Sequence, residues 1–177
     1  MGSPYIEGKS YFHPIKRTSP MTRIDIGLDE NVRKSVAAAL NATLSDTYAL
    51  YMKTHAYHWN VTGPQFHTLH VMFEEQYREM WTALDEVAER VRALGEFVPA
   101  SGKQFADLSA IENADTSSPA ASAMVERLLV DHETLIKRAR NGLAIAEDAG
   151  DAASADLLTV RIQTHEKTAW MLRSMSQ

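Results

Sequence analysis

The sequence has 177 residues, of which 45% are hydrophobic and 23% are charged, and this composition suits one globular domain. It contains no cysteine, which excludes disulfides, thiolate zinc sites, iron–sulfur clusters and thiol nucleophiles. The formal net charge is −5. The first twenty residues are basic and the remainder is acidic, which favours cations over DNA phosphates as partners. No apolar run approaches the roughly 18 residues that a membrane span requires.

We expect two parts, an N-terminal tail over residues 1–28 and a helical domain over residues 29–177. The first twenty residues lack the continuous apolar stretch of a signal peptide. We interpret part of this tail either as native or as a leader added for expression, and leave it out of the fold argument. The expected location is the cytoplasm, including the nucleoid.

The first predicted helix runs from about Glu30 to about Asn60. Its buried face follows a period near 3.6 residues: Val36, Leu40, Thr43, Leu44, Thr47, Tyr51 and Thr54. Four polar residues are predicted to lie off that face: Asn41, Ser45, Asp46 and Lys53. Gly63-Pro64 interrupts the helix pattern. A second helix is predicted from about Phe66 to Leu94, with Gly95 at the position of a C-terminal cap.

Residues 96–117 form a long connection in which Phe105, Leu108 and Ile111 predict a short helix. Ser118 and Pro119 then provide a predicted cap and first helical residue. A third long helix is predicted to end near Gly150, and a fourth to run from about 151 to 174. The pattern predicts an all-α fold, a ferritin-like four-helix bundle with a short helix in the crossover between the second and third long helices. An up-down-up-down bundle with a long loop is the alternative.

Five side chains with metal-ligand chemistry occur between residues 58 and 89: His58, His70, Glu74, Asp85 and Glu89. His58 lies on the apolar stripe of the first helix. The other four lie with Trp81 in a sector of roughly 100° on the second helix, at the border of its apolar face. Carboxylates at the border of a buried face need a compensating positive charge, because an unpaired buried charge is costly. Glu75, Glu79 and Glu86 instead fit a solvated surface.

The spacing of these residues predicts a site shared between two subunits. The His70/Glu74 and Asp85/Glu89 pairs are centred fifteen residues apart, or about 22 Å along one helix, and cannot bind one ion within one chain. If two copies of the helix pack antiparallel across a twofold axis, His70 and Glu74 of one meet Asp85 and Glu89 of the other. With His58, the ligands suit iron, and zinc or manganese would compete.

Several other chemistries are not indicated. Neither Glu-x-x-His nor His-Glu-x-x-His occurs, which argues against a di-iron site within one chain and against a zinc protease. His132 and His165 follow apolar residues at helical spacing and are predicted core or interface residues. His55 and His67 are predicted to be solvated or capping, with widening of the metal site as the alternative. Asp151 and Asp156 could line a cation pore or simply favour a helix N-terminus.

The segment His58-Trp59-Asn60-Val61-x-Gly63, followed by His70, Glu74, Asp85 and Ala88-Glu89-Arg90, resembles the signature of the Dps proteins, or mini-ferritins. The resemblance covers about residues 30–175. It implies a hollow homododecamer built from twofold dimers, with a ferroxidase centre between two subunits. His58, His70 and Glu74 would come from one subunit, and Asp85 and Glu89 from its mate, with Glu89 bridging two iron positions and Trp59 beside the site as a sink for stray oxidising equivalents.

The resemblance implies oxidation of Fe(II), with hydrogen peroxide preferred over oxygen, and storage of ferric mineral, which protects DNA from oxidative damage. The family usually has Asp at the position of Glu74, and the extra methylene moves the carboxylate outward. The alternative function is compaction of DNA by a protein whose metal site is structural or holds zinc. Charge does not support it, because twelve copies would carry roughly −60 and repel phosphates. A third option is a metal-free structural bundle.

Overall fold

The computed structural model describes residues 24–112 and 118–175, so most of the predicted tail lies outside the described residues. These ranges contain five helices and no strand: α1 (Glu30–Asn60), α2 (Phe66–Ala93), α3 (Gly102–Leu108), α4 (Ala121–Asp148) and α5 (Ala152–Met175). Within them, no helix combines the length and the apolar character needed to cross a membrane.

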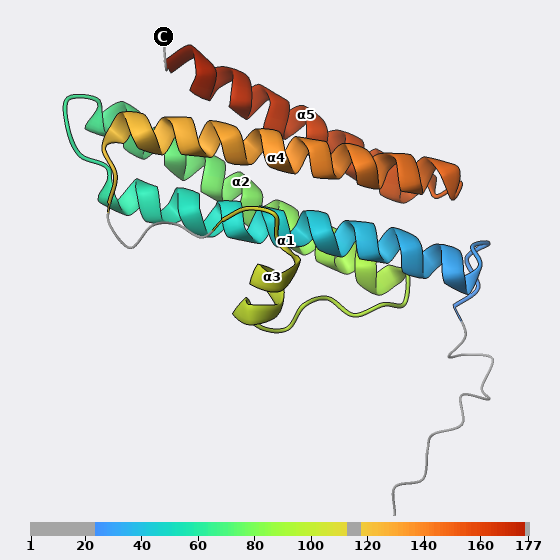
Figure 1. The fold of residues 1–177 in the computed structure, drawn as a ribbon. Helices are drawn as coiled ribbons and strands as arrows, with labels where there is room; N and C mark the ends of the chain where they lie inside the picture. The colour runs from blue at the N-terminus through green and yellow to red at the C-terminus, as the bar shows by residue number, and fades with distance from the viewer. Residues whose placement is uncertain (1–23, 113–117, 176–177) are drawn as a thin grey trace, which may run out of the picture.

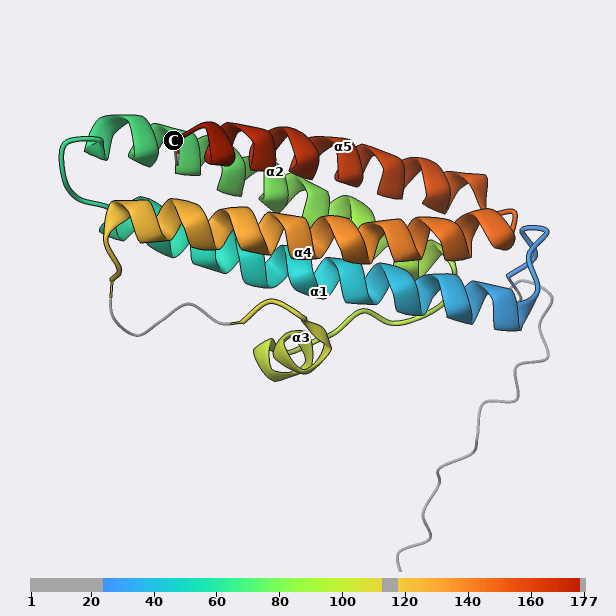
Figure 2. The ribbon, with the colours of Figure 1, turned by 45° about the horizontal axis from the view of Figure 1, so that its top comes forward.

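Four long helices form the bundle, and α3 lies outside it. The α1 and α2 helices form one antiparallel hairpin, and α4 and α5 form a second one packed against the first (Figures 1 and 2). The described part of the long crossover after α2, up to residue 112, runs back along the outside of α1 and includes α3 (Figure 2). This is the predicted arrangement, in which one long connection makes α1 and α4 neighbours.

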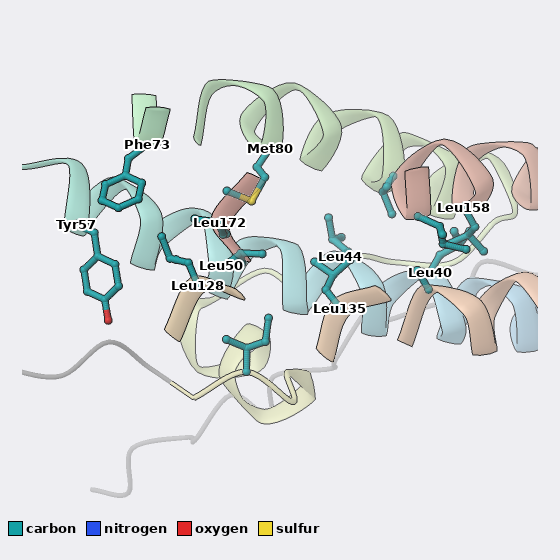
Figure 3. Close-up of a cluster of buried hydrophobic side chains, with 14 of the residues drawn as sticks. Leu40, Leu44, Leu50, Tyr57, Phe73, Met80, Leu128, Leu135, Leu158 and Leu172 are labelled. Carbon is teal, nitrogen blue, oxygen red and sulfur yellow. The ribbon is translucent and has the colours of Figure 1, made fainter. Parts of the chain in front are cut away.

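The core consists of leucines and other large apolar side chains contributed by all four long helices. Figure 3 shows part of this core, including Leu50, Phe73, Leu128 and Leu172 from the four helices. Each of these four side chains is fully buried. Because isolated helices are marginal in water, this shared apolar interior accounts for most of their stability.

The capping residues at the helix ends agree with the sequence-based predictions in α2 and differ from them in α4. Gly95 follows α2 with φ +95°, and its N–H bonds the Arg92 carbonyl, as expected for a glycine cap. Ser101 caps α3, since its side chain accepts from the Gln104 N–H. The prediction for α4 was wrong in detail. Ala120 is the N-cap and α4 begins at Ala121, so Ser118 and Pro119 precede the helix.

The prediction that Ser45, Asp46 and Lys53 lie off the buried face of α1 was wrong, because all three are buried. The crossover and α4 cover that side of the helix. Asp46 accepts hydrogen bonds from the backbone N–H of Ala110 at 2.6 Å and from Arg138 Nε at 2.9 Å. Lys53 Nζ lies 2.6 Å from a carboxylate oxygen of Asp131 on α4. These pairs supply the partners that buried charges need.

Candidate metal centre

His58 and His70 form a reciprocal pair at the junction of α1 and α2. His58 Nδ1 is 2.8 Å from the His70 carbonyl oxygen, and His70 Nδ1 is 2.9 Å from the His58 carbonyl oxygen. A carbonyl only accepts hydrogen bonds, so each ring carries its proton on Nδ1. Nε2 is therefore the nitrogen of each ring that is left to a metal, and the backbone contact fixes the orientation of the ring.

Local structure explains why the two rings meet. His58 is in the last turn of α1, where backbone carbonyls lack partners within the helix. His70 Nδ1–H satisfies one of them from the second turn of α2. The short connection between the helices contains Gly63 with φ +108°, a conformation that side-chain-bearing residues rarely adopt. The two rings stack with centroids 3.8 Å apart.

Glu74 lies one turn after His70 but is engaged by another side chain. Its Oε1 accepts from Arg78 Nε at 2.9 Å and lies 2.6 Å from Arg78 Nη2. The hydrogen bond from Arg78 lowers the pKa of Glu74, and the nearby His58 and His70 act in the same direction. Glu74 is thus an ionised carboxylate beside the histidine pair, and Arg78 competes with any metal for it.

Asp85 and Glu89 lie on an exposed face near the other end of α2. Because α2 is continuous from Phe66 to Ala93, the sequence-derived separation of about 22 Å from the histidine end applies. Across residues 24–112 and 118–175, no three His, Asp or Glu side chains are grouped so that they could hold a metal. The described residues therefore bring His58 and His70 together but do not join Glu74 to them as a third ligand, and Asp85 and Glu89 lie apart from both. Asp85 also lines an apolar groove of about 740 Å³ beside the crossover.

Aromatic residues that the spacing argument did not include surround the histidine pair. Tyr77 is in edge contact with the His58 ring, with centroids 5.2 Å apart, and is stacked on the His55 ring at 3.9 Å. Trp59 also packs against the His55 ring, with centroids 4.0 Å apart, and remains 62% exposed. Sequence reasoning missed Tyr77 and Arg78, although their spacing of three and four residues from Glu74 places them on the same face of α2.

Some of the remaining predictions for polar residues are confirmed, and others need correction. His132 and His165 are core residues, as expected, with 1% exposure each. Glu79 is partly exposed, as expected for a solvated charge, but it also forms an unpredicted two-pronged ion pair with the buried Arg161 at 2.6 and 2.8 Å. Asp151 is buried, pairs with Arg90 and accepts from the Ser154 N–H at the start of α5, which is the capping role. His67 is exposed.

Comparison with known proteins places this bundle in a class. A family model described as "Ferritin-like domain" matches residues 37–177, so the chain is a ferritin-like protein. It is 39% identical to DNA protection during starvation protein 2 of Bacillus anthracis, over 81% of this chain and 97% of that protein. It is 42% identical to an uncharacterized low temperature-induced protein of Nostoc, over 87% of each chain.

Among solved structures, the Dps protein of Vibrio cholerae O1 superposes with a TM-score of 0.82 at 32% identity, over 86% of this chain and 95% of that one. Its description places it in a superfamily of ferritin-like diiron-carboxylate proteins. Dps of Staphylococcus aureus superposes with a TM-score of 0.78 at 33% identity, over 81% and 96%. The chain belongs to the Dps family.

Proposed function

We propose that this protein is a ferroxidase and iron-storage mini-ferritin whose catalytic centre is completed between two subunits. His58, His70 and Glu74 of one subunit bind Fe(II) together with Asp85 and Glu89 of its twofold mate. The assembled form is a hollow homododecamer that stores ferric mineral and, by consuming Fe(II) together with peroxide, protects DNA. Iron is here the substrate, and zinc or manganese would compete for the same ligands.

The observation that carries the proposal is the His58/His70 pair. Both rings are fixed through Nδ1 by backbone carbonyls. An imidazole that only fills a core does not need this fixed orientation, and here both rings lie close enough to Glu74 for their electrostatic interaction with it to lower the pKa of its carboxyl. Asp85 and Glu89 are exposed on the same helix, as required of ligands that act on a neighbouring subunit.

The ligand set suits the chemistry of iron oxidation. Two Fe(II) ions give up one electron each to hydrogen peroxide, whose O–O bond breaks to give two hydroxide ions. Carboxylates favour the ferric product, because hard anionic oxygens bind the more highly charged ion better. Holding both ions in one centre lets peroxide take its two electrons together, so that no hydroxyl radical is released. We assign Glu89 as the bridge between the two iron positions.

Trp59 is assigned an accessory role. Its indole lies against His55 within the aromatic cluster around the histidine pair, and it is largely exposed. A one-electron oxidant that escaped the centre could be reduced by this indole before reaching other targets. We expect the protein to act in the cytoplasm, where Fe(II), hydrogen peroxide and oxygen are available.

The test is an anaerobic Fe(II) titration of the purified protein, followed by hydrogen peroxide while ferric absorbance is recorded. The expected result is saturation near two Fe(II) per subunit and rapid oxidation, both lost in Asp85→Ala/Glu89→Ala. Glu86→Gln, on the same helix, is the matched control and should behave like the wild type. No saturable binding, or oxidation no faster than in buffer, would contradict the proposal.

A gel-shift assay over a salt series distinguishes DNA compaction from iron oxidation as the main activity. The net charge of −5 per chain predicts no strong binding at low salt. Strong binding that falls steeply with salt, together with a failed iron titration, would replace the ferroxidase assignment with the DNA-binding one.

A further inference from the structure

A second polar cluster lies inside the bundle, on side chains that the proposed iron centre does not use. It borders a cavity of about 190 Å³ between α2 and α5 that also reaches α4. The floor of this cavity is formed by Gln76 of α2, His132 of α4 and His165 of α5. Ligand sites in helix bundles are built from side chains of facing helices in this way.

The hydrogen bonds of this cluster fix the proton positions on both rings. Arg161, held by Glu79, places Nη2 3.4 Å from His165 Nε2. A guanidinium only donates, so His165 Nε2 accepts and the His165 proton is on Nδ1. His165 Nδ1 lies 3.0 Å from His132 Nδ1 and therefore donates to it. His132 must then carry its own proton on Nε2.

The chain of hydrogen bonds ends in groups without partners. His132 Nε2 is buried and unpaired, and so are both the Oε1 and Nε2 atoms of Gln76. Exposure is 1% for His132 and 9% for Gln76. Leaving a buried polar group unsatisfied is costly, and native proteins rarely accept this cost for several groups at once. Burial also lowers the pKa of His132 to about 3, so the ring is a neutral N–H donor at neutral pH.

The unpaired groups define what they can bind. A ligand must accept from His132 Nε2–H and from the Gln76 amide, and donate to Gln76 Oε1. A metal cation offers no acceptor, and Arg161 is positively charged next to the rings. Glu79 already balances that charge, so an anion would be desolvated without a partner charge.

We propose that this cavity binds a small uncharged hydroxylic molecule, either water or hydrogen peroxide, held by His132 and Gln76. One water corresponds to about 30 Å³ of liquid, so the space admits either molecule. The site is separate from the iron centre, and the proposal does not depend on ferroxidase activity.

The test is crystallography of the metal-free assembled protein at a resolution that shows ordered water. We expect an oxygen atom within hydrogen-bond distance of both His132 Nε2 and the Gln76 amide. After a hydrogen peroxide soak, two-oxygen density would identify peroxide as a ligand, and an unchanged single oxygen would identify water. An empty cavity would overturn the proposal. So would anomalous signal at this place from a cobalt or bromide soak, which would identify a cation or an anion site.

Two variants sharpen the result. Gln76→Met keeps the length of the side chain but removes the amide, and the ordered oxygen should disappear. Glu75→Gln is the matched control, since Glu75 lines the same cavity but is exposed. The oxygen should remain in that variant. Retention of the oxygen in Gln76→Met would show that the amide does not bind it.

Discussion

The protein contains two pairs of histidines that the fold uses in opposite ways. In the His58/His70 pair, each ring bonds a backbone carbonyl through Nδ1, which leaves Nε2 available near a helix end. In the His132/His165 pair, the rings bond each other through Nδ1 in the middle of the bundle, beside an arginine. The residue type is the same, and the hydrogen-bond partner of one nitrogen decides the use of the other.

Burial separates the pairs as well. Desolvation by burial is the main reason why the pKa values of both His132 and His165 are lowered. Neither ring can therefore easily take up a proton or a cation. His58, with 8% exposure, and the half-buried His70 are less completely enclosed, and they lie at the end of the hairpin next to the anionic Glu74. If His58 and His70 bind iron as proposed, a metal-ligand role requires a directed lone pair and a neighbouring anion, which histidine spacing alone does not establish.

Truncating one member of each pair should separate binding from stability. His132→Ala removes the acceptor for His165 Nδ1–H and leaves a cavity, so we expect a loss of about 2–4 kcal/mol in the free energy of unfolding with iron oxidation unchanged in the folded protein. His58→Ala should lower the oxidation rate on the order of a hundredfold with a much smaller loss of stability. Denaturant unfolding and the peroxide assay measure the two effects. If either variant lost stability and iron oxidation to the same extent, the proposed difference between the two histidine pairs would be contradicted.

Acid should affect the buried pair. In the unfolded chain His132 has a pKa near 6.5, and in the folded protein about 3. Between these values the unfolded state binds more protons, so stability is full above pH 6.5 and is lost as pH falls toward 3. At pH 5 this amounts to about 2 kcal/mol for His132.

Unfolding free energies at pH 7.5 and pH 5 test this effect. His132→Asn should show a smaller loss between the two pH values than the wild type does. His67→Asn, at an exposed position, is the control and should match the wild type. An identical pH dependence in all three proteins would mean that His132 is not held neutral.

The smallest effect concerns the competition for Glu74. Arg78→Gln removes the ion pair that occupies this carboxylate, and we expect Fe(II) to bind a few-fold more tightly. Lys34→Gln is the matched control, because Lys34 pairs with Glu30 at the same i,i+4 spacing on the surface. Weaker Fe(II) binding in Arg78→Gln would indicate that Arg78 supports the site and does not compete for it. Anaerobic titration provides the measurement.

Much of the fold follows from local sequence signals. The period of apolar residues in α1 and α2, and the glycine after α2, predicted helices that end within a residue or so of the observed ones. The errors at Asp46 and Lys53 and the unpredicted ion pair of Glu79 share one cause. Their partners Arg138, Asp131 and Arg161 lie between 78 and 92 residues away in the chain, and only the packing of the second hairpin brings them close.

The candidate site follows a similar rule. Spacing along α2 was enough to predict that the His70/Glu74 and Asp85/Glu89 pairs lie far apart, because a helix has a fixed rise, and their role as ligands stays a prediction. Tyr77 was missed because its role arises from ring contacts across α1 and α2 that no single-helix pattern contains. The tautomers of the two histidine pairs likewise required the hydrogen-bond partners, which come from residues on other turns or other helices.

The central claim, that two subunits share one centre, is tested most directly by mixed assembly. One subunit carries His58→Ala/His70→Ala and the other Asp85→Ala/Glu89→Ala, and each alone should be inactive. Mixed at equal amounts through reversible dissociation, half of the dimers contain one of each, and one of their two sites has every ligand. The account predicts recovery of roughly a quarter of wild-type iron oxidation. No recovery in mixtures verified to contain both subunits would contradict a shared centre.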